Sequence, residues 1–413
     1  MKTDLDQIMA ARGLDGLLIT GPGQYNPAMV YFTGPAMLTH ADLVVRRGEA
    51  PLLYCHPMER DAAARTGLRT SSYLRFPLAE LIKEAGGDRA RAQGLRYARM
   101  LAEAGLSSGR VAVYGKVEIG PAWGALTSLR EALPGIELVG EAEDAVLMQA
   151  RATKSPDEVE HIRAVGQATL AVVAELQDYL TTRPVKEGCL TTRTGNPLTI
   201  GQVKGRIERW CIERGLENPE GTIFSIGRDA AVPHNPGNPA APLRLGQTIV
   251  LDIYPREKGG GYFYDFTRTW CLGFAPEEAQ SLYDHVLGVY RQMRGEYTAG
   301  KPGALLQQRA CELFEGLGHP TLRTDPETET GYVHGLGHGV GLDIHEKPWV
   351  TGTADDTDVL RPGSVVTLEP GLYYPERGLG VRLEDTLWIA PDGMAQSIVD
   401  FPMELVLPVR PQA

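Results

Sequence analysis

Two acidic residues lie on either side of a predicted turn in the second half of this 413-residue sequence. In TIVLDIYPREKGGGYFYDFTRTW, two β-rich segments, 248–254 and 262–270, flank the glycine-rich stretch 258–261, which is typical of a hairpin turn. Asp252 and Asp265 are equidistant from the midpoint of residues 258 and 259. We therefore expect them directly opposite each other on one face of the hairpin, about 5 Å apart.

A second pair of acids has the same arrangement near the C-terminus. In SVVTLEPGLYYPERGLGVRLEDTLWI, Glu369 and Glu384 are equidistant from the dipeptide at 376–377. Four carboxylates gathered on one sheet surface repel one another unless protons, arginines or divalent metal ions compensate them. Asp252 alone would more often be a solvated residue, but Asp265 and Glu384 have apolar neighbours in their strands, where an uncompensated charge is costly.

A histidine-rich segment, GYVHGLGHGVGLDIHEKPWV, lies between the two hairpins and supplies His334, His338 and His345. An oxygen-rich site with one imidazole suits Mn, Co, Fe or Zn in a two-ion arrangement better than a closed tetrahedral zinc site. Glycines are expected where backbone must approach a ligand closely. Four of them separate these histidines: Gly335, Gly337, Gly339 and Gly341.

The elements that must position these residues occur twice in one order. Each set has a long helix, a second helix and then strands with a hairpin, and the helices are predicted at 156–180 and 200–214, then at 276–296 and 303–317. This order predicts an internal duplication with one pair of acids in each half. Two stretches rich in Gly, Thr and Pro, 184–197 and 318–331, interrupt corresponding places and are predicted to be loops.

A smaller α/β domain is predicted before this duplicated part. It has helices at 4–12, 88–104 and 121–133 and strands at 16–20, 43–46 and 51–55, the last two forming a hairpin. The sequence Ser155-Pro156-Asp157-Glu158 is typical of a helix start, with Pro in the first turn and acids at the positive end of the helix dipole. We therefore predict two domains, 1–150 and 151–413.

Composition and charge exclude several classes of partner. Apolar residues make up 43% and charged residues 23% of the chain, enough for well-formed cores. The 41 basic residues against 52 acidic residues give a net charge of −11, which repels nucleic acid and anionic lipids. The apolar runs are too short to span a membrane, and the first residues do not read as a secretory signal, so a cytoplasmic location is expected. The 5 cysteines have no CxxC spacing and are predicted to be buried thiols.

These motifs resemble the pita-bread metallopeptidase family, which includes Xaa-Pro dipeptidase (prolidase), aminopeptidase P and the metal-free relative creatinase. The matching stretches are LDIYPREKGGGYFYDFTRTW, HGLGHGVGLDIHE, LEPGLY and VRLEDT, in the family's order and at nearly its spacing. LDGLLIT and MVYFTG look like its creatinase-type N-terminal domain. The resemblance implies an α/β (α+β) chain, with a smaller N-terminal α/β domain and a C-terminal pita-bread domain that has internal pseudo-two-fold symmetry.

By this resemblance, two divalent metal ions are expected, with Mn first and Co, Zn or Fe as alternatives. The family pattern places their ligands at Asp252, Asp265, His338, Glu369 and Glu384. Asp265 and Glu384 would be shared by the ions, Asp252 would serve one, and His338 and Glu369 the other. The spacing of the two aspartates is longer than the family usually has, which implies a longer hairpin turn.

The resemblance also implies catalytic and substrate-binding roles. Glu369 would accept and pass on the proton of the attacking water, and His334 or His345 would stabilise the oxyanion. Three residues match substrate-side positions: His234, Tyr373 and Arg382. The substrate would be a small proline-containing peptide, and the enzyme a homodimer.

Several functions share this pattern. The expected activity is that of an Xaa-Pro dipeptidase, with aminopeptidase P and a proline-specific carboxypeptidase as alternatives that use the same metal centre. Two alternatives of other kinds are a metal-free, creatinase-like hydrolase of C–N bonds and a catalytically silent binding module. The complete set of five ligands argues against both of these.

Overall fold

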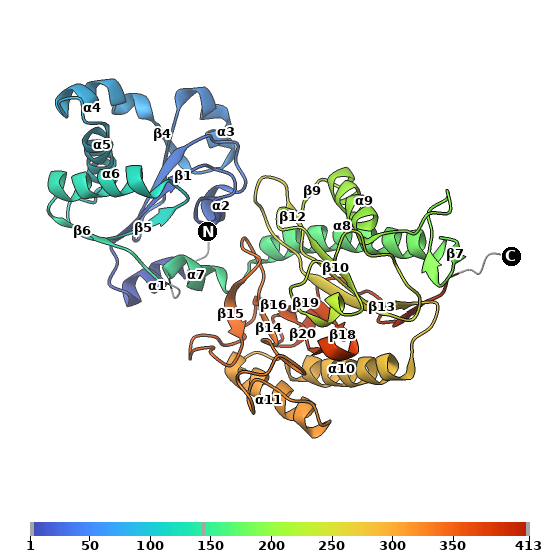
Figure 1. The fold of residues 1–413 in the computed structure, drawn as a ribbon. Coiled ribbons are helices and arrows are strands. Elements are labelled where there is room, and N and C mark those ends of the chain that lie inside the picture. Colours follow the sequence, from blue (N-terminus) through green and yellow to red (C-terminus); the bar gives the residue numbers. More distant parts are fainter. Residues whose placement is uncertain (1–3, 143–144, 410–413) are drawn as a thin grey trace. The chain divides into compact units, whose positions relative to one another are not determined.

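The computed structural model describes residues 4–142 and 145–409 (Figure 1). The chain divides into two compact units, of which the first comprises Met1–Arg151 with Lys258–Gly261 and the second Ala152–Glu257 with Tyr262–Ala413. The ends of the two predicted domains, 1–3 and 410–413, lie outside the described residues. Among the residues described, none of the helices combines the length and the apolar character needed to cross a membrane.

The first unit is built on one sheet with the strand order β4-β3-β2-β1-β5-β6. Its strands are β1 Gly16–Gly21, β2 Ala41–Arg46, β3 Leu52–Cys55, β4 Arg69–Ser72, β5 Gly109–Gly115 and β6 Ile136–Val139. β2 runs antiparallel to β1 and β3, which confirms the predicted hairpin, and the other neighbours are parallel.

Helices cover both faces of this sheet. They are α1 Leu5–Ala11, α2 Pro27–Thr33, α3 Arg60–Arg65, α4 Leu78–Glu84, α5 Arg89–Glu103, α6 Ile119–Ala132 and α7 Val146–Arg151. Alternate residues of β1 enter different cores: Leu17 packs with Met9 of α1, and Leu18 with Leu101 of α5. Every residue of β1 is buried for this reason.

The second unit contains a larger sheet with the order β10-β11-β13-β19-β16-β14-β15. These strands are β10 Thr222–Ile226, β11 Thr248–Ile253, β13 Phe266–Leu272, β14 Gly337–Gly339, β15 Glu346–Val350, β16 Val365–Leu368 and β19 Glu384–Ile389. β20 Ala395–Ser397 pairs with β19, and β21 Val406–Leu407 pairs with β13. The two halves meet where β13 and β19 pair antiparallel, so each half contributes one side of the sheet, as the predicted duplication requires.

The four long helices predicted for this unit are present. They are α8 Pro156–Thr181, α9 Ile200–Glu213, α10 Glu277–Glu296 and α11 Gly303–Gly316. α8 begins with a capping box, in which the backbone N–H of Ser155 donates to the Glu158 carboxylate at 2.7 Å and the Glu158 N–H donates to the Ser155 hydroxyl at 3.3 Å. The predicted helix start is therefore confirmed, and such a cap stabilises a helix by about 1 kcal/mol.

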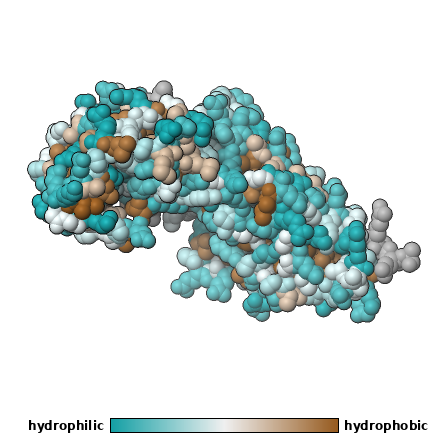
Figure 2. Space-filling view, turned by 90° about the horizontal axis from the view of Figure 1, so that it is seen from above, coloured by the Kyte–Doolittle hydropathy of each residue, from teal (hydrophilic) through white to brown (hydrophobic). Residues whose placement is uncertain are grey.

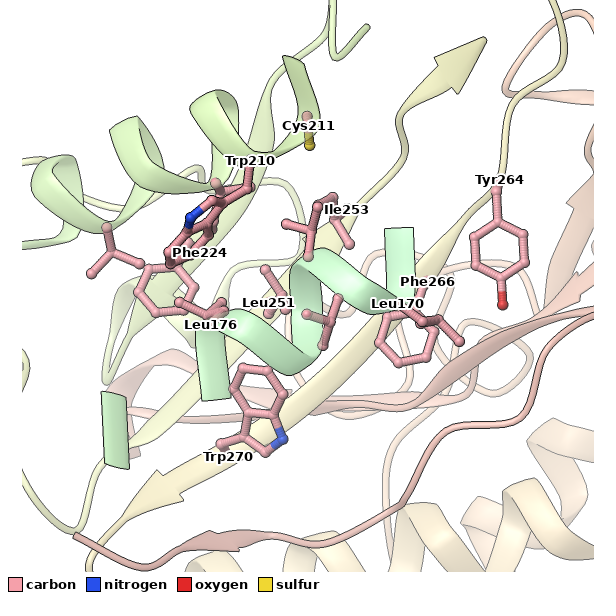
Figure 3. Close-up of a cluster of buried hydrophobic side chains, with 14 of the residues drawn as sticks. Leu170, Leu176, Trp210, Cys211, Phe224, Leu251, Ile253, Tyr264, Phe266 and Trp270 are labelled. Atoms are coloured by element: carbon pink, nitrogen blue, oxygen red, sulfur yellow. The ribbon is translucent and has the colours of Figure 1, made fainter. Parts of the chain in front are cut away.

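Side chains along β11 and β13 point alternately to the two faces of the sheet, one of which faces the core while the other is polar. Leu251, Ile253 and Trp270 pack against α8 and α9, together with Leu176 and Trp210 of those helices (Figure 3). Truncating a buried Trp of this kind to Ala costs about 3–5 kcal/mol. The intervening side chains point to the other face of the sheet, which leaves that face for polar residues.

The two predicted loops differ in the structure. Residues 184–197 are not entirely irregular, because β7 Val185–Lys186 and β8 Cys189–Leu190 form a small hairpin. Its turn is Glu187-Gly188, and the positive φ of both residues suits a two-residue hairpin turn. Residues 318–331, all of them described, have no helix or strand, as predicted.

The remaining short strands are β9 Leu216–Glu217, β12 Arg256–Glu257, β17 Gly371–Tyr374 and β18 Leu379–Arg382. All cysteines are buried and unpaired, as predicted. Figure 2 shows hydrophilic residues over most of the face in view, with apolar residues in smaller groups among them.

Candidate functional site

The first predicted hairpin forms, but its register was predicted wrongly. Asp252 of β11 lies opposite Thr267 of β13 rather than opposite Asp265. The turn is centred one residue later than expected, on Gly259 and Gly260, whose φ values of 85° and 82° favour glycine. Asp265 is thus two residues from the partner of Asp252. Because side chains alternate along a strand, the two carboxylates are diagonal neighbours on one face.

The second hairpin has the predicted register. Leu368 of β16 lies opposite Asp385 of β19, so the adjoining Glu369 and Glu384 lie across from each other. The chain turns through the short 3₁₀ helix Pro375–Arg377, where the turn was predicted. Each hairpin therefore supplies two acids to the polar face of the sheet.

The acids meet His338 of β14 in one buried cluster. Ligand atoms of Asp265, His338 and Glu384 lie within 4.8 Å of one another. The Nε2 atom of His338 is 3.7 Å from Oδ2 of Asp265 and 3.5 Å from Oε1 of Glu369. Asp252 lies beside them, since its charge acts on the other three carboxylates. The structure therefore brings all five predicted ligands together.

Burial and mutual repulsion raise the proton affinity of this cluster. Burial, followed by the charges of Asp252 and Glu369, raises the pKa of Asp265 well above its usual value. Burial, followed by the charge of Asp265, does the same for Glu384. Burial also raises the pKa of Glu369 to about 8. Without cations, these carboxylates cannot all be ionised at neutral pH.

His338 presents a free nitrogen to the acids. Its Nδ1 lies 3.1 Å from the carbonyl oxygen of Gly339, and a carbonyl only accepts, so Nδ1 carries the proton and Nε2 keeps its lone pair. Burial, helped by the nearby ring of His345, lowers the His338 pKa to about 3, so the ring is neutral. A neutral imidazole with a fixed tautomer is the form that binds metal ions.

His334 is held on both sides of its ring. Its Nδ1–H donates to the carbonyl oxygen of Gly335 at 2.7 Å, and its Nε2 lies 3.0 Å from the hydroxyl of Tyr373. Nη1 of Arg382 donates to the same hydroxyl at 2.7 Å, and Arg382 is also ion-paired with Asp252. Two of the three residues predicted to bind substrate, Tyr373 and Arg382, thus orient other site residues in this structure.

Three threonines that the sequence analysis passed over support the ligands. Their hydroxyl contacts are Thr267 to Oε2 of Glu384 at 2.6 Å, Thr386 to the carbonyl oxygen of Asp265 at 2.8 Å, and Thr367 to Oε1 of Glu369 at 3.4 Å. Each threonine stands two residues from one of the acids. That spacing puts it on the same face of a strand, and this was the signal that could have identified it.

The glycines around the histidines lie close to other atoms of the protein. A Cβ atom on Gly337 would lie 2.1 Å from the carbonyl oxygen of Thr367, and one on Gly341 would lie 2.2 Å from Oε1 of Glu346. Glycine is needed there because protein atoms approach the backbone closely. Gly335 and Gly337 also line the cavity over the cluster, so close approach of their backbone to a ligand stays a prediction.

A cavity of about 550 Å³ opens over the cluster. Its wall includes His234, His334 and His345, which the sequence analysis had placed at the site. Tyr373, in contrast, is not part of this wall. The wall also contains residues that the sequence analysis missed: Lys204, Ile223, Glu220, Tyr254, Ile344, Trp349 and Thr351. Tyr254, Ile344 and Trp349 lie inside the segments that supply the acids and histidines, and this closeness was the signal that could have identified them. The other four lie outside these segments, and the sequence carried no signal for them.

Lys204 and Glu220 bring opposite charges to this wall, outside the ligand cluster. Nζ of Lys204 donates to the carbonyl oxygen of Pro236 at 3.1 Å, and desolvation lowers its pKa. Desolvation lowers the pKa of His345, and the nearby charge of Glu220 opposes this change. Within the described residues, neither Lys204 nor Glu220 forms an ion pair, so both charges remain available to a substrate.

Comparisons with known proteins agree with this geometry. Residues 160–391 match the model of metallopeptidase family M24. The chain is 30% identical to an Xaa-Pro dipeptidase of Pyrococcus furiosus over 255 residues, which cover 60% of this chain and 64% of that protein. It is 30% identical to a putative dipeptidase of Bacillus subtilis over 284 residues, 68% of either chain. The chain thus matches a little less than two thirds of the length of the first relative.

Solved structures share the fold of the whole chain. A dipeptidase from Pyrococcus horikoshii superposes with a TM-score of 0.73 at 22% identity and covers 98% of both chains. Aminopeptidase P from Escherichia coli superposes with a TM-score of 0.67 at 19% identity and covers 95% of this chain and 93% of that one. The predicted architecture, a smaller N-terminal α/β domain before a pita-bread domain, is confirmed.

Proposed function

Because this chain belongs to metallopeptidase family M24, we propose that it is a dinuclear metal peptidase that cleaves Xaa-Pro dipeptides. One observation carries the proposal: four carboxylates and Nε2 of His338 converge in a buried cluster beneath a cavity of substrate size. The relative from Pyrococcus furiosus is itself named an Xaa-Pro dipeptidase.

The donor set fits divalent metal ions. Carboxylate oxygens with one imidazole suit Mn, Co, Fe or Zn, and the single guanidinium of Arg382 is too little positive charge for four acids. Oδ1 of Asp252 is buried without a hydrogen-bond partner in the described structure, as an unused ligand atom would be. Two ions, with Mn as the native metal, would be held by Asp252, Asp265, His338, Glu369 and Glu384, with Asp265 and Glu384 shared.

The residues around the ions would carry out the proton transfers. When bound, such ions lower the pKa of water and polarise a carbonyl. A carboxylate oxygen of Glu369 would accept the proton of the attacking water and deliver it to the proline nitrogen, which has no N–H before cleavage. Since both nitrogens of His334 are engaged, His345 is the better candidate to donate to the oxyanion, a role worth about 3 kcal/mol.

The wall of the cavity favours a substrate with two free termini. A dipeptide carries an ammonium group and a carboxylate group a few bonds apart, and Glu220 and Lys204 offer one uncompensated charge to each. A longer peptide does not carry both charged termini within a few bonds of the cleaved bond. We therefore favour a dipeptidase over an aminopeptidase or a carboxypeptidase, with His234 contacting the proline ring.

The experiment compares three substrates in buffer with Mn: a free Xaa-Pro dipeptide, an Xaa-Pro tripeptide, and an N-blocked peptide that ends in Pro. The wild-type protein should cleave only the dipeptide. Lys204→Met should raise KM for the dipeptide by about 10- to 100-fold, since a charged hydrogen bond is lost. Lys301→Met, at an exposed lysine outside the cavity, is the matched control and should leave KM unchanged.

Each of the other outcomes would indicate a different function. Cleavage of the tripeptide would indicate an aminopeptidase P, and cleavage of the blocked peptide a carboxypeptidase. No cleavage of any peptide would replace the proposal with a creatinase-like hydrolase or a silent binding module. A dipeptide KM that is unchanged in Lys204→Met would remove Lys204 from substrate recognition while leaving the peptidase activity in place.

Two further expectations stay predictions. The resemblance implies a homodimer, which light scattering after size-exclusion chromatography would test by giving twice the monomer mass of 44.9 kDa. The cytoplasmic location was expected from the sequence, and fractionation of cells that produce the protein would test it.

A further inference from the structure

Helix α9 borders a second cavity besides the catalytic one. Lys204 of this helix lines the catalytic cavity, whereas Arg206 and Arg209 line another cavity of about 620 Å³. The rest of the wall comes from Tyr179 near the end of α8, from Arg183, from residues of the segment 192–198 and from further residues of α9. We call this cavity the arginine pocket, after the four arginines in its wall: Arg183, Arg193, Arg206 and Arg209.

These arginines are not neutralised by the protein. Within the described parts of the chain, none of the four forms an ion pair with a carboxylate, although Arg214, which directly follows α9, pairs with Glu175 at 2.6 Å. The chain as a whole has a net charge of −11. A group of four unpaired arginines is therefore a local positive charge on an acidic protein. Like charges this close repel, and a bound anion would relieve the repulsion.

Two of the guanidinium groups are held in place by an aromatic ring. The guanidinium carbons of Arg183 and Arg206 lie 4.6 and 4.3 Å from the ring centre of Tyr179, and this ring packs edge-on against Trp210 at 6.0 Å. The Nε atom of Arg183 is buried and has no hydrogen-bond partner in the described structure. The contacts with this ring therefore set the positions of two positive groups of the pocket before any ligand binds.

We propose that the arginine pocket binds a small multivalent anion that carries phosphate groups. The planar guanidinium fork matches two phosphate oxygens at once. Four positive charges exceed what one phosphate group can neutralise, and a cavity of about 620 Å³ is the size of a small-molecule site rather than of a single ion. A polyphosphate chain or a phosphorylated metabolite would satisfy this chemistry.

The test is isothermal titration calorimetry of the full-length, metal-loaded protein with inorganic tripolyphosphate and, separately, with a sugar bisphosphate. Saturable binding is expected to the wild type, and Arg206→Glu should weaken it by at least about tenfold, because a charged contact is replaced by repulsion. Arg291→Glu changes the charge equally at an exposed position of α10 and is the matched control. It should bind like the wild type.

Comparing the two variants distinguishes the heat of binding in the arginine pocket from heat that arises elsewhere. Polyphosphates also bind metal ions, but that contribution would be equal in Arg206→Glu and Arg291→Glu. Equal affinities in the two variants, or no saturable binding to the wild type, would overturn the proposal. Should Arg206→Glu fold poorly by circular dichroism, Arg209→Glu replaces it, since Arg209 makes no contact with the Tyr179 ring. Tighter binding of tripolyphosphate than of the bisphosphate would assign a polyphosphate, and the reverse a metabolite.

Discussion

The buried ion pair between Lys154 and Glu346 should contribute strongly to stability. Nζ of Lys154 lies 2.6 Å from Oε1 of Glu346, and both side chains are only 1% exposed. Oε2 of Glu346 also accepts the N–H of Asp343 at 3.4 Å, so the pair anchors the segment that carries His345. In Lys154→Met, the buried carboxylate of Glu346 would lose its contact with this cation. Breaking a buried pair in this way costs about 3–5 kcal/mol.

Thermal unfolding measures this cost. Since about 1 kcal/mol corresponds to about 2–4 °C in a unit of this size, Lys154→Met should lower the unfolding midpoint by roughly 6–20 °C. Differential scanning calorimetry would compare it with Glu346→Gln and with the double variant. The double variant has neither charge and should recover much of the loss, because neutral replacements for a buried pair are often tolerated.

An exposed ion pair provides the control. Glu278→Gln breaks the contact of Glu278 with Arg377 at 3.3 Å, where the side chains are 67% and 46% exposed, and the midpoint should change by no more than about 2 °C. The reasoning is refuted if Lys154→Met unfolds within about 2 °C of the wild type. It is also refuted if the double variant loses as much as both single variants together, because the two charges would then not be coupled.

Three further predictions concern the metal ions, pH and a glycine. Removal of metal by a chelator should abolish peptide hydrolysis and lower the unfolding midpoint, and Mn or Co should restore both; full activity of a metal-free sample would contradict this. Burial, followed by the charge of His285, lowers the pKa of His319 from 6.5 to about 4. Below pH 6.5 the unfolded chain therefore binds a proton at His319 that the folded chain excludes. The stability contributed by the neutral ring should be complete above pH 6.5 and fall by about 1–3 kcal/mol toward pH 4, measured by urea denaturation as the difference between the wild type and His319→Gln. Gly337→Ala would place a Cβ 2.1 Å from the carbonyl oxygen of Thr367, so unfolding should be easier by about 1–3 kcal/mol and hydrolysis weaker, whereas Gly316→Ala, with open space around it, should leave both unchanged.

The two hairpins show how well the sequence spacing of two acids predicts which residues pair across a hairpin. At the second hairpin, the equidistant Glu369 and Glu384 lie across from each other, as predicted. At the first, the turn lies on the pair Gly259-Gly260, which both have positive φ, so its centre moves by one residue and the partner of Asp252 moves by two residues, to Thr267. The face of Asp265 was still predicted correctly, since a period of two survives such a shift.

The sequence by itself determined the long helices, the hairpins and the acids and histidine that converge, because periods of 2.0 and 3.6 residues and turn chemistry act over a few neighbouring residues. Only the tertiary structure decided which distant side chains meet. It placed Lys204 and Glu220 on the wall of the catalytic cavity and gathered the four arginines in the wall of a second cavity. It also engaged Arg382 with Asp252 and Tyr373. Such contacts join residues far apart in sequence, and they depend on how whole helices and strands pack, which no local pattern encodes.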